Sequence, residues 1–183
     1  MDRKLSDKEW HRKFMYAAKH FGEWSKCMSR QIGSVLVKDK TIIATGYNGP
    51  PRNVPHCDSV FRKEMLCRLI ERRSDIPNEA IGIVMEYKGC PRKAINNISG
   101  SLLEFCPAGH SERNAITNAA REGVSIKGAD LYCYCPLPCQ ECAKSIINAG
   151  IKTVYYLGGE YDDTAQWLFD AAHIRTIPLK DIL

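Results

Sequence analysis

The sequence predicts an α/β fold in which strands and helices form a layered sheet. Two observations support this prediction. Short β-rich runs alternate with segments of helical periodicity through the second half of the chain, and turn residues separate them. The chain has 183 residues, 44% of them hydrophobic, which is enough for one domain with its own core. We therefore expect a single domain over residues 1–183, with an insert at about 57–106.

Each element has a local signal. Ser6 and Glu9 match a capping box, and apolar residues recur at helical spacing behind it. Gly123 and Gly150 are suited to end two later helices. The expected elements are a helix over 10–24, a hairpin of strands 32–37 and 41–45, a loop over 46–51, a helix over 59–73, a loop-rich stretch up to Cys106, a helix over 111–121, a strand over 131–135, a helix over 139–149, a strand over 154–157, a helix over 164–172 and a strand over 174–177.

Composition excludes several classes of protein. The net charge of +5 suits a phosphate-bearing partner, but no block of like charge predicts a nucleic-acid-binding tail. The charged N-terminus lacks the apolar run of a signal peptide, and no stretch approaches the ~18 apolar residues of a membrane span. We expect a soluble cytoplasmic protein, in the host cytoplasm if it is viral. The odd count of nine cysteines then favours thiols and metal ligands over a disulfide framework.

A metal site is predicted by His110 together with the Pro-Cys-x-x-Cys run that contains Cys139 and Cys142. A catalytic zinc ion takes three protein ligands and leaves one position open. The two cysteines are three residues apart at a predicted helix start, so they point the same way, and a helix N-terminus favours the thiolate. Glu112 lies two residues past His110 and can sit beside the open position as a proton shuttle.

Other interpretations of these motifs remain. The site could be a closed structural zinc site with Cys135 or Cys106 as fourth ligand. A thioredoxin-like redox use of Cys-x-x-Cys would leave His110 and Glu112 unexplained. The combined His-x-Glu and Pro-Cys-x-x-Cys pattern is typical of zinc-dependent nucleobase deaminases.

Over about residues 10–180 the chain resembles the deoxycytidylate deaminases in their bacterial and phage-like form. The segments that carry this resemblance are Arg30–Asp39, Gly46–Arg52, Pro55–Asp58, His110–Ile116 and Pro138–Lys144. The resemblance implies a three-layer α/β/α cytidine-deaminase-like fold with a five-stranded mixed sheet. It implies hydrolysis of dCMP to dUMP and ammonia with zinc, in a homohexamer activated by dCTP and inhibited by dTTP, each with Mg²⁺. Two positions depart from the family: Ser111 stands where alanine is usual, and Cys135 replaces a hydroxyl near the pocket wall.

The resemblance also implies substrate and effector contacts. Asn48 would hold the sugar, although Asn-Gly is also a common turn pair. Tyr156 would lie near the sugar and phosphate, unless it is a packed strand aromatic. Ser111 would touch the base. Gly46, Tyr47 and Gly49 would form the loop through which the effectors act.

The phosphate also needs a cation, and Arg30, Arg113 and Arg121 are equal candidates.

A second, structural zinc ion is implied by a cysteine-bearing insert of the same family. Its ligands would be Cys27, His56, Cys90 and Cys106, with Cys57 as a replacement for His56. A metal ion would pin a loop-rich insert that has little core of its own. The alternative is a group of buried free thiols.

Two rival functions share some of these features. A polynucleotide deaminase, acting on tRNA or single-stranded DNA, would have both zinc motifs, but the chain has little basic surface to follow a phosphate backbone. A non-catalytic, zinc-stabilised nucleotide-binding module would have no need for Glu112.

Overall fold

The structure is a computed structural model that describes residues 5–95, 102–159 and 162–180. The chain divides into two compact units. Unit 1 comprises Met1–Ser25, Ile32–Asn48 and His110–Leu183, and unit 2 comprises Lys26–Gln31 and Gly49–Gly109. Unit 2 contains the insert predicted at 57–106 and is wider than it. The assignment of 1–183 to a single domain stays a prediction.

Unit 1 is built on a five-stranded mixed sheet, as the resemblance implies. Its strands are β1 (Gly33–Lys38), β2 (Thr41–Tyr47), β3 (Asp130–Cys133), β4 (Thr153–Tyr156) and β5 (Arg175–Pro178), in the order β2-β1-β3-β4-β5. The strand β1 pairs antiparallel with both β2 and β3. The remaining pairs, β3 with β4 and β4 with β5, are parallel.

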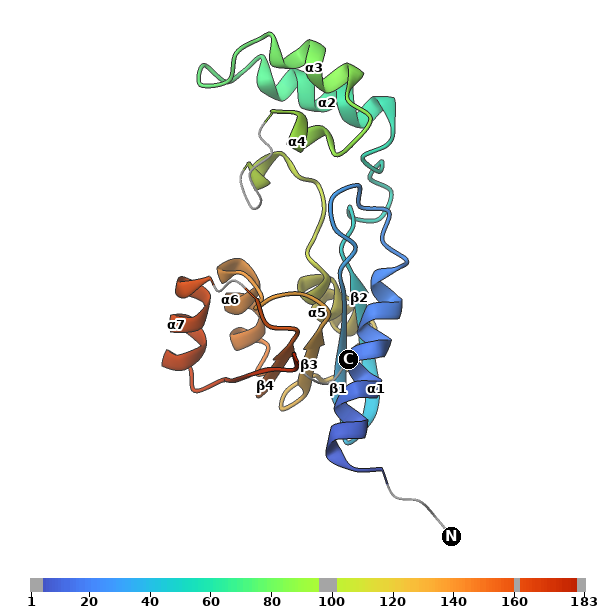
Figure 1. Cartoon of the computed structure of the whole chain (residues 1–183), viewed down its shortest axis with the longest axis vertical. Helices are drawn as coiled ribbons and strands as arrows, with labels where there is room; N and C mark the ends of the chain where they lie inside the picture. The colour runs from blue at the N-terminus through green and yellow to red at the C-terminus, as the bar shows by residue number, and fades with distance from the viewer. Residues whose placement is uncertain (1–4, 96–101, 160–161, 181–183) are drawn as a thin grey trace. The chain divides into compact units, whose positions relative to one another are not determined.

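Helices cover both faces of this sheet, so the three-layer prediction is confirmed (Figure 1). One face packs on α1 (Asp7–Gly22), whose predicted capping box is present. The other face packs on α5 (Ser111–Arg121), α6 (Gln140–Asn148) and α7 (Asp163–Ala171). Side chains alternate along each strand as a two-residue period requires: Leu131 packs toward α6 and Tyr132 toward α1.

The segment predicted as a loop from residue 46 begins later than expected. The strand β2 runs through Gly46 to Tyr47, where both pair with β1. Glycine is required at 46 because an added Cβ would overlap the backbone of Ser111 and Ala115 in α5. The helix α5 therefore packs directly on the backbone of β2.

Unit 2 is more helical than the sequence predicts. The predicted helix is present as α2 (Val60–Ile70), capped by Ser59. The stretch expected to be loop-rich also contains α3 (Ala80–Glu86), α4 (Pro91–Ile95) and a 3₁₀ turn over Leu103–Phe105. These elements share a small apolar core of their own, which includes Leu66, Val84 and Phe105. Two further residues of the cysteine-bearing insert, Ser99 and Gly100, lie outside the described residues.

No helix in the described part of the chain is both long and apolar enough to cross a membrane.

Candidate metal centre and active site

Two helix starts present the candidate ligands. His110 is the N-cap of α5, and Cys139 is the N-cap of α6. Each has the extended backbone typical of that position, and neither uses its side chain to cap its own helix. Cys142 follows in the first turn of α6, on the same side as Cys139. The helix starts therefore leave the imidazole and both thiols available for another partner.

The three predicted ligands converge. The Nδ1 atom of His110 lies 3.4 Å from the Sγ atom of Cys139 and 3.3 Å from that of Cys142. Among the described residues, no fourth histidine, cysteine or carboxylate joins this group. Cys135 is thus not a fourth ligand here. One nitrogen and two sulfurs with no fourth protein donor match an open, tetrahedral zinc site, so the residues fit the predicted metal.

The electrostatics favour a thiolate in this group. Hydrogen bonds from Cys142 and His110 lower the pKa of Cys139 to about 4. The start of α6 adds a favourable dipole for negative charge. A thiolate is the form in which cysteine binds metal.

Glu112 is buried beside this group, with 4% of its surface exposed. Burial raises the pKa of its carboxyl. Carboxylate and sulfur atoms of Glu112, Cys133 and Cys135 lie within 4.8 Å of one another, so both thiols border the carboxyl. Burial raises the pKa of the Cys133 thiol as well, and the hydrogen bond with Cys133, together with burial, raises that of Cys135. We interpret Cys133 and Cys135 as neutral thiols in the wall of the site.

The predicted substrate residues occupy different environments. Ser111 is fully buried and donates a hydrogen bond of 2.9 Å to Oε2 of Glu112. Asn48 is 7% exposed, and its Oδ1 accepts a hydrogen bond from the backbone of Ile32 at 2.8 Å. Tyr156 is 2% exposed and belongs to the core between the sheet and α6. Asn48 therefore holds the local backbone, and Tyr156 packs as a strand aromatic, whatever further role each has.

The predicted effector residues span both units. Gly46 and Tyr47 end β2 in unit 1, and the exposed fraction of Tyr47 is 38%. Gly49 belongs to unit 2, where its backbone pairs with that of Gly109 in two hydrogen bonds of 3.1 and 2.8 Å.

The predicted second ligand set lies within unit 2. Burial raises the pKa of the Cys57 thiol to about 11. The same thiol interacts electrostatically with three other cysteines, Cys106, Cys90 and Cys27. Burial also raises the pKa of Cys106, on which Cys27 and Cys90 act as well. These four cysteines are therefore neighbours, although no three of their sulfurs lie within 4.8 Å of one another in the described structure.

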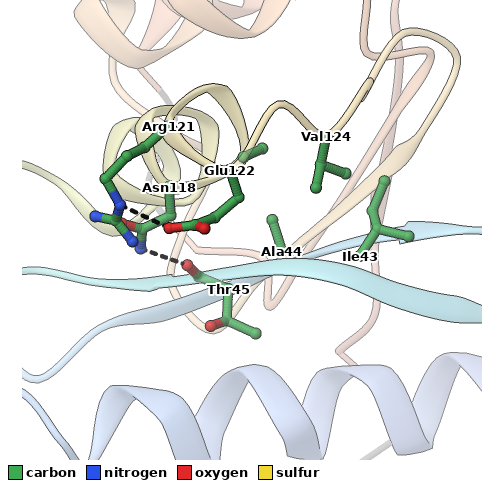
Figure 2. A pocket seen from close by; sticks show the side chains of 8 residues that line it. Ile43, Ala44, Thr45, Asn118, Arg121, Glu122 and Val124 are labelled. Carbon is green, nitrogen blue, oxygen red and sulfur yellow. Dashed lines mark hydrogen bonds and ion pairs between the residues drawn. The ribbon is translucent and has the colours of Figure 1, made fainter.

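The candidate phosphate ligands differ in position. Arg113 is exposed in the first turn of α5, and its charge acts on His110. Arg121 ends the same helix, ~15 Å along its axis from the start. There it binds Glu122 at 2.8 Å and Asn118 at 3.1 Å. These side chains border a surface hollow, shown in Figure 2, lined by Ile43, Ala44, Thr45, Asn118, Ala119, Arg121, Glu122 and Val124. Arg30 lies in unit 2.

One site residue escaped the sequence analysis. Ser34, in β1, is fully buried, and its Oγ lies 2.7 Å from Oγ of Ser111. The two serines are 77 positions apart, and no local pattern links them. The only available signal was a polar residue within the apolar run of β1.

An α/β/α sheet that presents a histidine and two cysteines beside a buried glutamate defines a zinc-dependent deaminase-like site. The family described as the cytidine and deoxycytidylate deaminase zinc-binding region matches residues 8–158, and the chain belongs to this family.

Relatives and solved structures agree with this assignment. The chain is 34% identical to the deoxycytidylate deaminase of Schizosaccharomyces pombe over 167 residues, which cover 91% of this chain and 42% of that protein. It is also 34% identical to the deoxycytidylate deaminase of Enterobacteria phage T2, over 72% of this chain and 71% of the relative. The chain thus spans less than half of the length of the S. pombe protein. The crystal structure of the dCMP deaminase from cyanophage S-TIM5, in complex with dCMP and dUMP, has a TM-score of 0.64 and 24% identity, covering 96% of this chain and all of that one. At that identity, the last comparison supports the fold alone.

Proposed function

We propose that this chain is a zinc-dependent deaminase that hydrolyses dCMP to dUMP and ammonia. The observation that carries the proposal is the convergence of His110, Cys139 and Cys142 beside the buried carboxyl of Glu112. Family membership and the names of the two relatives support the choice of a deoxycytidylate as substrate.

The proposed chemistry divides between the metal and Glu112. His110, Cys139 and Cys142 would hold zinc, whose Lewis acidity makes water a stronger nucleophile at neutral pH. Glu112 takes a proton from the water that attacks C4 of the base and delivers it to ring N3. It then carries the second proton of that water to the exocyclic amine, which leaves as ammonia. The products are a uracil ring and ammonia, and the carboxylate is regenerated.

The environment of Glu112 suits this task. Its burial excludes water and raises its pKa, so the carboxyl accepts a proton more readily than an exposed glutamate does.

Nucleotide recognition is assigned to Asn48 and Tyr156. The side-chain oxygen of Asn48 accepts a hydrogen bond from the backbone N–H of Ile32. This bond orients the side-chain amide nitrogen of Asn48. Such an orientation suits a contact with a sugar hydroxyl. Tyr156 ends β4, and its partner Cys133 ends β3 in the wall of the site. Its phenol is placed near the sugar and phosphate only by the family resemblance.

A second zinc site in unit 2 is proposed as a structural site. Its ligands are Cys27, Cys90 and Cys106, with a fourth from His56 or Cys57. The electrostatic neighbours of Cys57 support Cys57, because all three other cysteines act on its thiol. Arg62 gives a further argument: it is buried, and its Nε and Nη1 atoms have no hydrogen-bond partner within the described structure. Its charge acts on Cys57, as a counter-charge to zinc-bound thiolates would.

The proposal includes regulation by nucleotides. dCTP with Mg²⁺ would activate and dTTP with Mg²⁺ would inhibit, through Gly46, Tyr47 and Gly49, in a homohexamer. The segment carries Asn48 between two of these residues, so an effector that shifts it moves a proposed substrate contact.

A reducing compartment such as the cytoplasm fits the nine free cysteines, none paired in a disulfide.

One assay tests the proposed function. Purified protein with measured zinc content is given dCMP, dCTP, deoxycytidine, CMP, single-stranded DNA or tRNA, and ammonia release is followed. We expect the highest kcat/KM with dCMP. Turnover only on a polynucleotide would replace the proposal with that rival function. Nucleotide binding without ammonia from any compound would indicate a binding module.

A further inference from the structure

The carboxyl of Glu112 lies at the end of a chain of buried hydroxyl groups. Oγ of Ser111 donates a hydrogen bond of 2.9 Å to Oε2 of Glu112. Oγ of Ser34 lies 2.7 Å from Oγ of Ser111. Both serines are fully buried, and the thiol of Cys133 lies 3.5 Å from the Ser34 hydroxyl at the other end of the chain.

The direction of this chain follows from counting hydrogens. An ionised carboxylate only accepts, so Ser111 gives its single hydroxyl hydrogen to Glu112. The 2.7 Å contact between the serines then requires Ser34 to donate to Ser111. Ser111 and Glu112 both lie in the first turn of α5, whereas Ser34 lies on β1, so these hydrogen bonds tie the carboxylate of α5 to a strand of unit 1.

We infer that Ser34 and Ser111 are positioning residues that hold Glu112 in the orientation needed for proton transfer to the base. The inference rests on the proposed function, since it gives Glu112 the shuttle role. Ser111 binds Oε2 and thereby restricts rotation of the carboxyl group. A glutamate side chain otherwise loses rotamer freedom when it is ordered, and a hydrogen-bond partner already in place orders it before substrate binds.

The environment of Ser111 distinguishes this role from direct contact with the base. Its side chain is fully buried, and its oxygen already has two protein partners. A hydroxyl in that position can also accept from a carboxylic acid, so Ser111 can hold Glu112 in both protonation states that the shuttle visits.

The test compares Ser34→Ala, Ser111→Ala and the double variant with the wild-type chain. Ser145→Ala is the matched control, because that serine bonds only its own helix, to the carbonyl of Glu141. For each protein, kcat and KM for dCMP, zinc content and thermal unfolding are measured. We expect Ser111→Ala to lower kcat about tenfold, with KM within about twofold and zinc content unchanged. The double variant should lose little more than Ser111→Ala alone, because the two hydroxyls act as one unit.

Crystal structures of wild type and Ser111→Ala give a readout that does not depend on activity. We expect one Glu112 conformer in the wild type and several, or a shifted one, in the variant. An unchanged kcat with an unchanged Glu112 conformer would overturn the inference, as would strictly additive losses in the double variant. A wild-type chain inactive on dCMP would contradict the proposed function instead, and the two crystal structures would still decide whether the serines position Glu112.

Discussion

The Nδ1 atom of His110 lies 3.3 Å from the Sγ atom of Cys142, although 32 residues separate them in the chain. The contact exists because α5 and α6 pack on the same face of the sheet and the residues at their N-terminal ends lie together. Two helix N-termini therefore meet at one point and favour negative charge there. Such an arrangement favours thiolate ligands.

Replacing Glu112 with glutamine should abolish turnover while zinc stays bound. The amide keeps the shape of the side chain but cannot carry a proton, and general acid–base catalysis contributes ~10²–10⁴-fold. The measurement is kcat for dCMP alongside zinc per chain. Glu122→Gln is the control, since that glutamate is exposed at the far end of α5. Near wild-type kcat in Glu112→Gln would show that the shuttle is assigned wrongly.

His110→Ala and Cys139→Ala should each lose the catalytic zinc and the activity together. Each substitution leaves two protein donors, too few to hold the ion in a tetrahedral site. Metal analysis after dialysis against a chelator, and activity before and after zinc is restored, check this. Cys67→Ala, in the core of unit 2, should keep both. Full activity in zinc-depleted protein would contradict the metal assignment.

The fourth ligand of the second site can be decided by a pair of substitutions. If Cys57 is the ligand, Cys57→Ala should lower the zinc content by about one per chain while His56→Ala leaves it unchanged. If His56 is the ligand, the result is reversed. A wild-type content of one zinc per chain, unaffected by either change, would leave the four cysteines as free thiols and remove the second site from the proposal.

Gly46→Ala should destabilise unit 1, because the new methyl group would overlap the backbone of Ser111 and Ala115. Overpacking of this kind costs about 1–3 kcal/mol, and more when backbone must move. Thermal and denaturant unfolding measure the effect. Gly82→Ala is the control, since nothing lies within 4 Å of a Cβ there and alanine favours the helix α3 by about 0.5–1 kcal/mol. Equal stability of Gly46→Ala and wild type would mean that β2 and α5 are not in such close contact.

Regulation should be visible in the dCMP saturation curve. We expect a sigmoidal curve for dCMP alone, a nearly hyperbolic one with dCTP and Mg²⁺, and suppression by dTTP that added dCMP does not relieve as simple competition would. An allosteric coupling of 1–3 kcal/mol changes apparent affinity by ~5–150-fold. A curve that is hyperbolic throughout and indifferent to both triphosphates would identify a catalyst without this switch.

Local pattern was sufficient for most of the secondary structure of unit 1. The capping box at Ser6 marks the start of α1, and the predicted helix over 111–121 coincides with α5. Local pattern was insufficient in unit 2, where the sequence predicts a loop-rich stretch and the structure has α3 and α4. Helices of seven and five residues hold few turns of periodicity, and their apolar residues are ordered by packing against α2.

The sequence by itself determined which residues form the candidate site, because His110, Glu112, Cys139 and Cys142 are chemically distinctive at short, regular spacing. The tertiary structure alone decided what surrounds them: Ser34 beside Ser111, the wall of Cys133 and Cys135, and the glycine that β2 requires under α5. The physical reason is distance along the chain. A ligand motif is local and keeps its spacing in any fold, whereas a buried hydroxyl finds its partner only when the sheet brings together residues 77 positions apart.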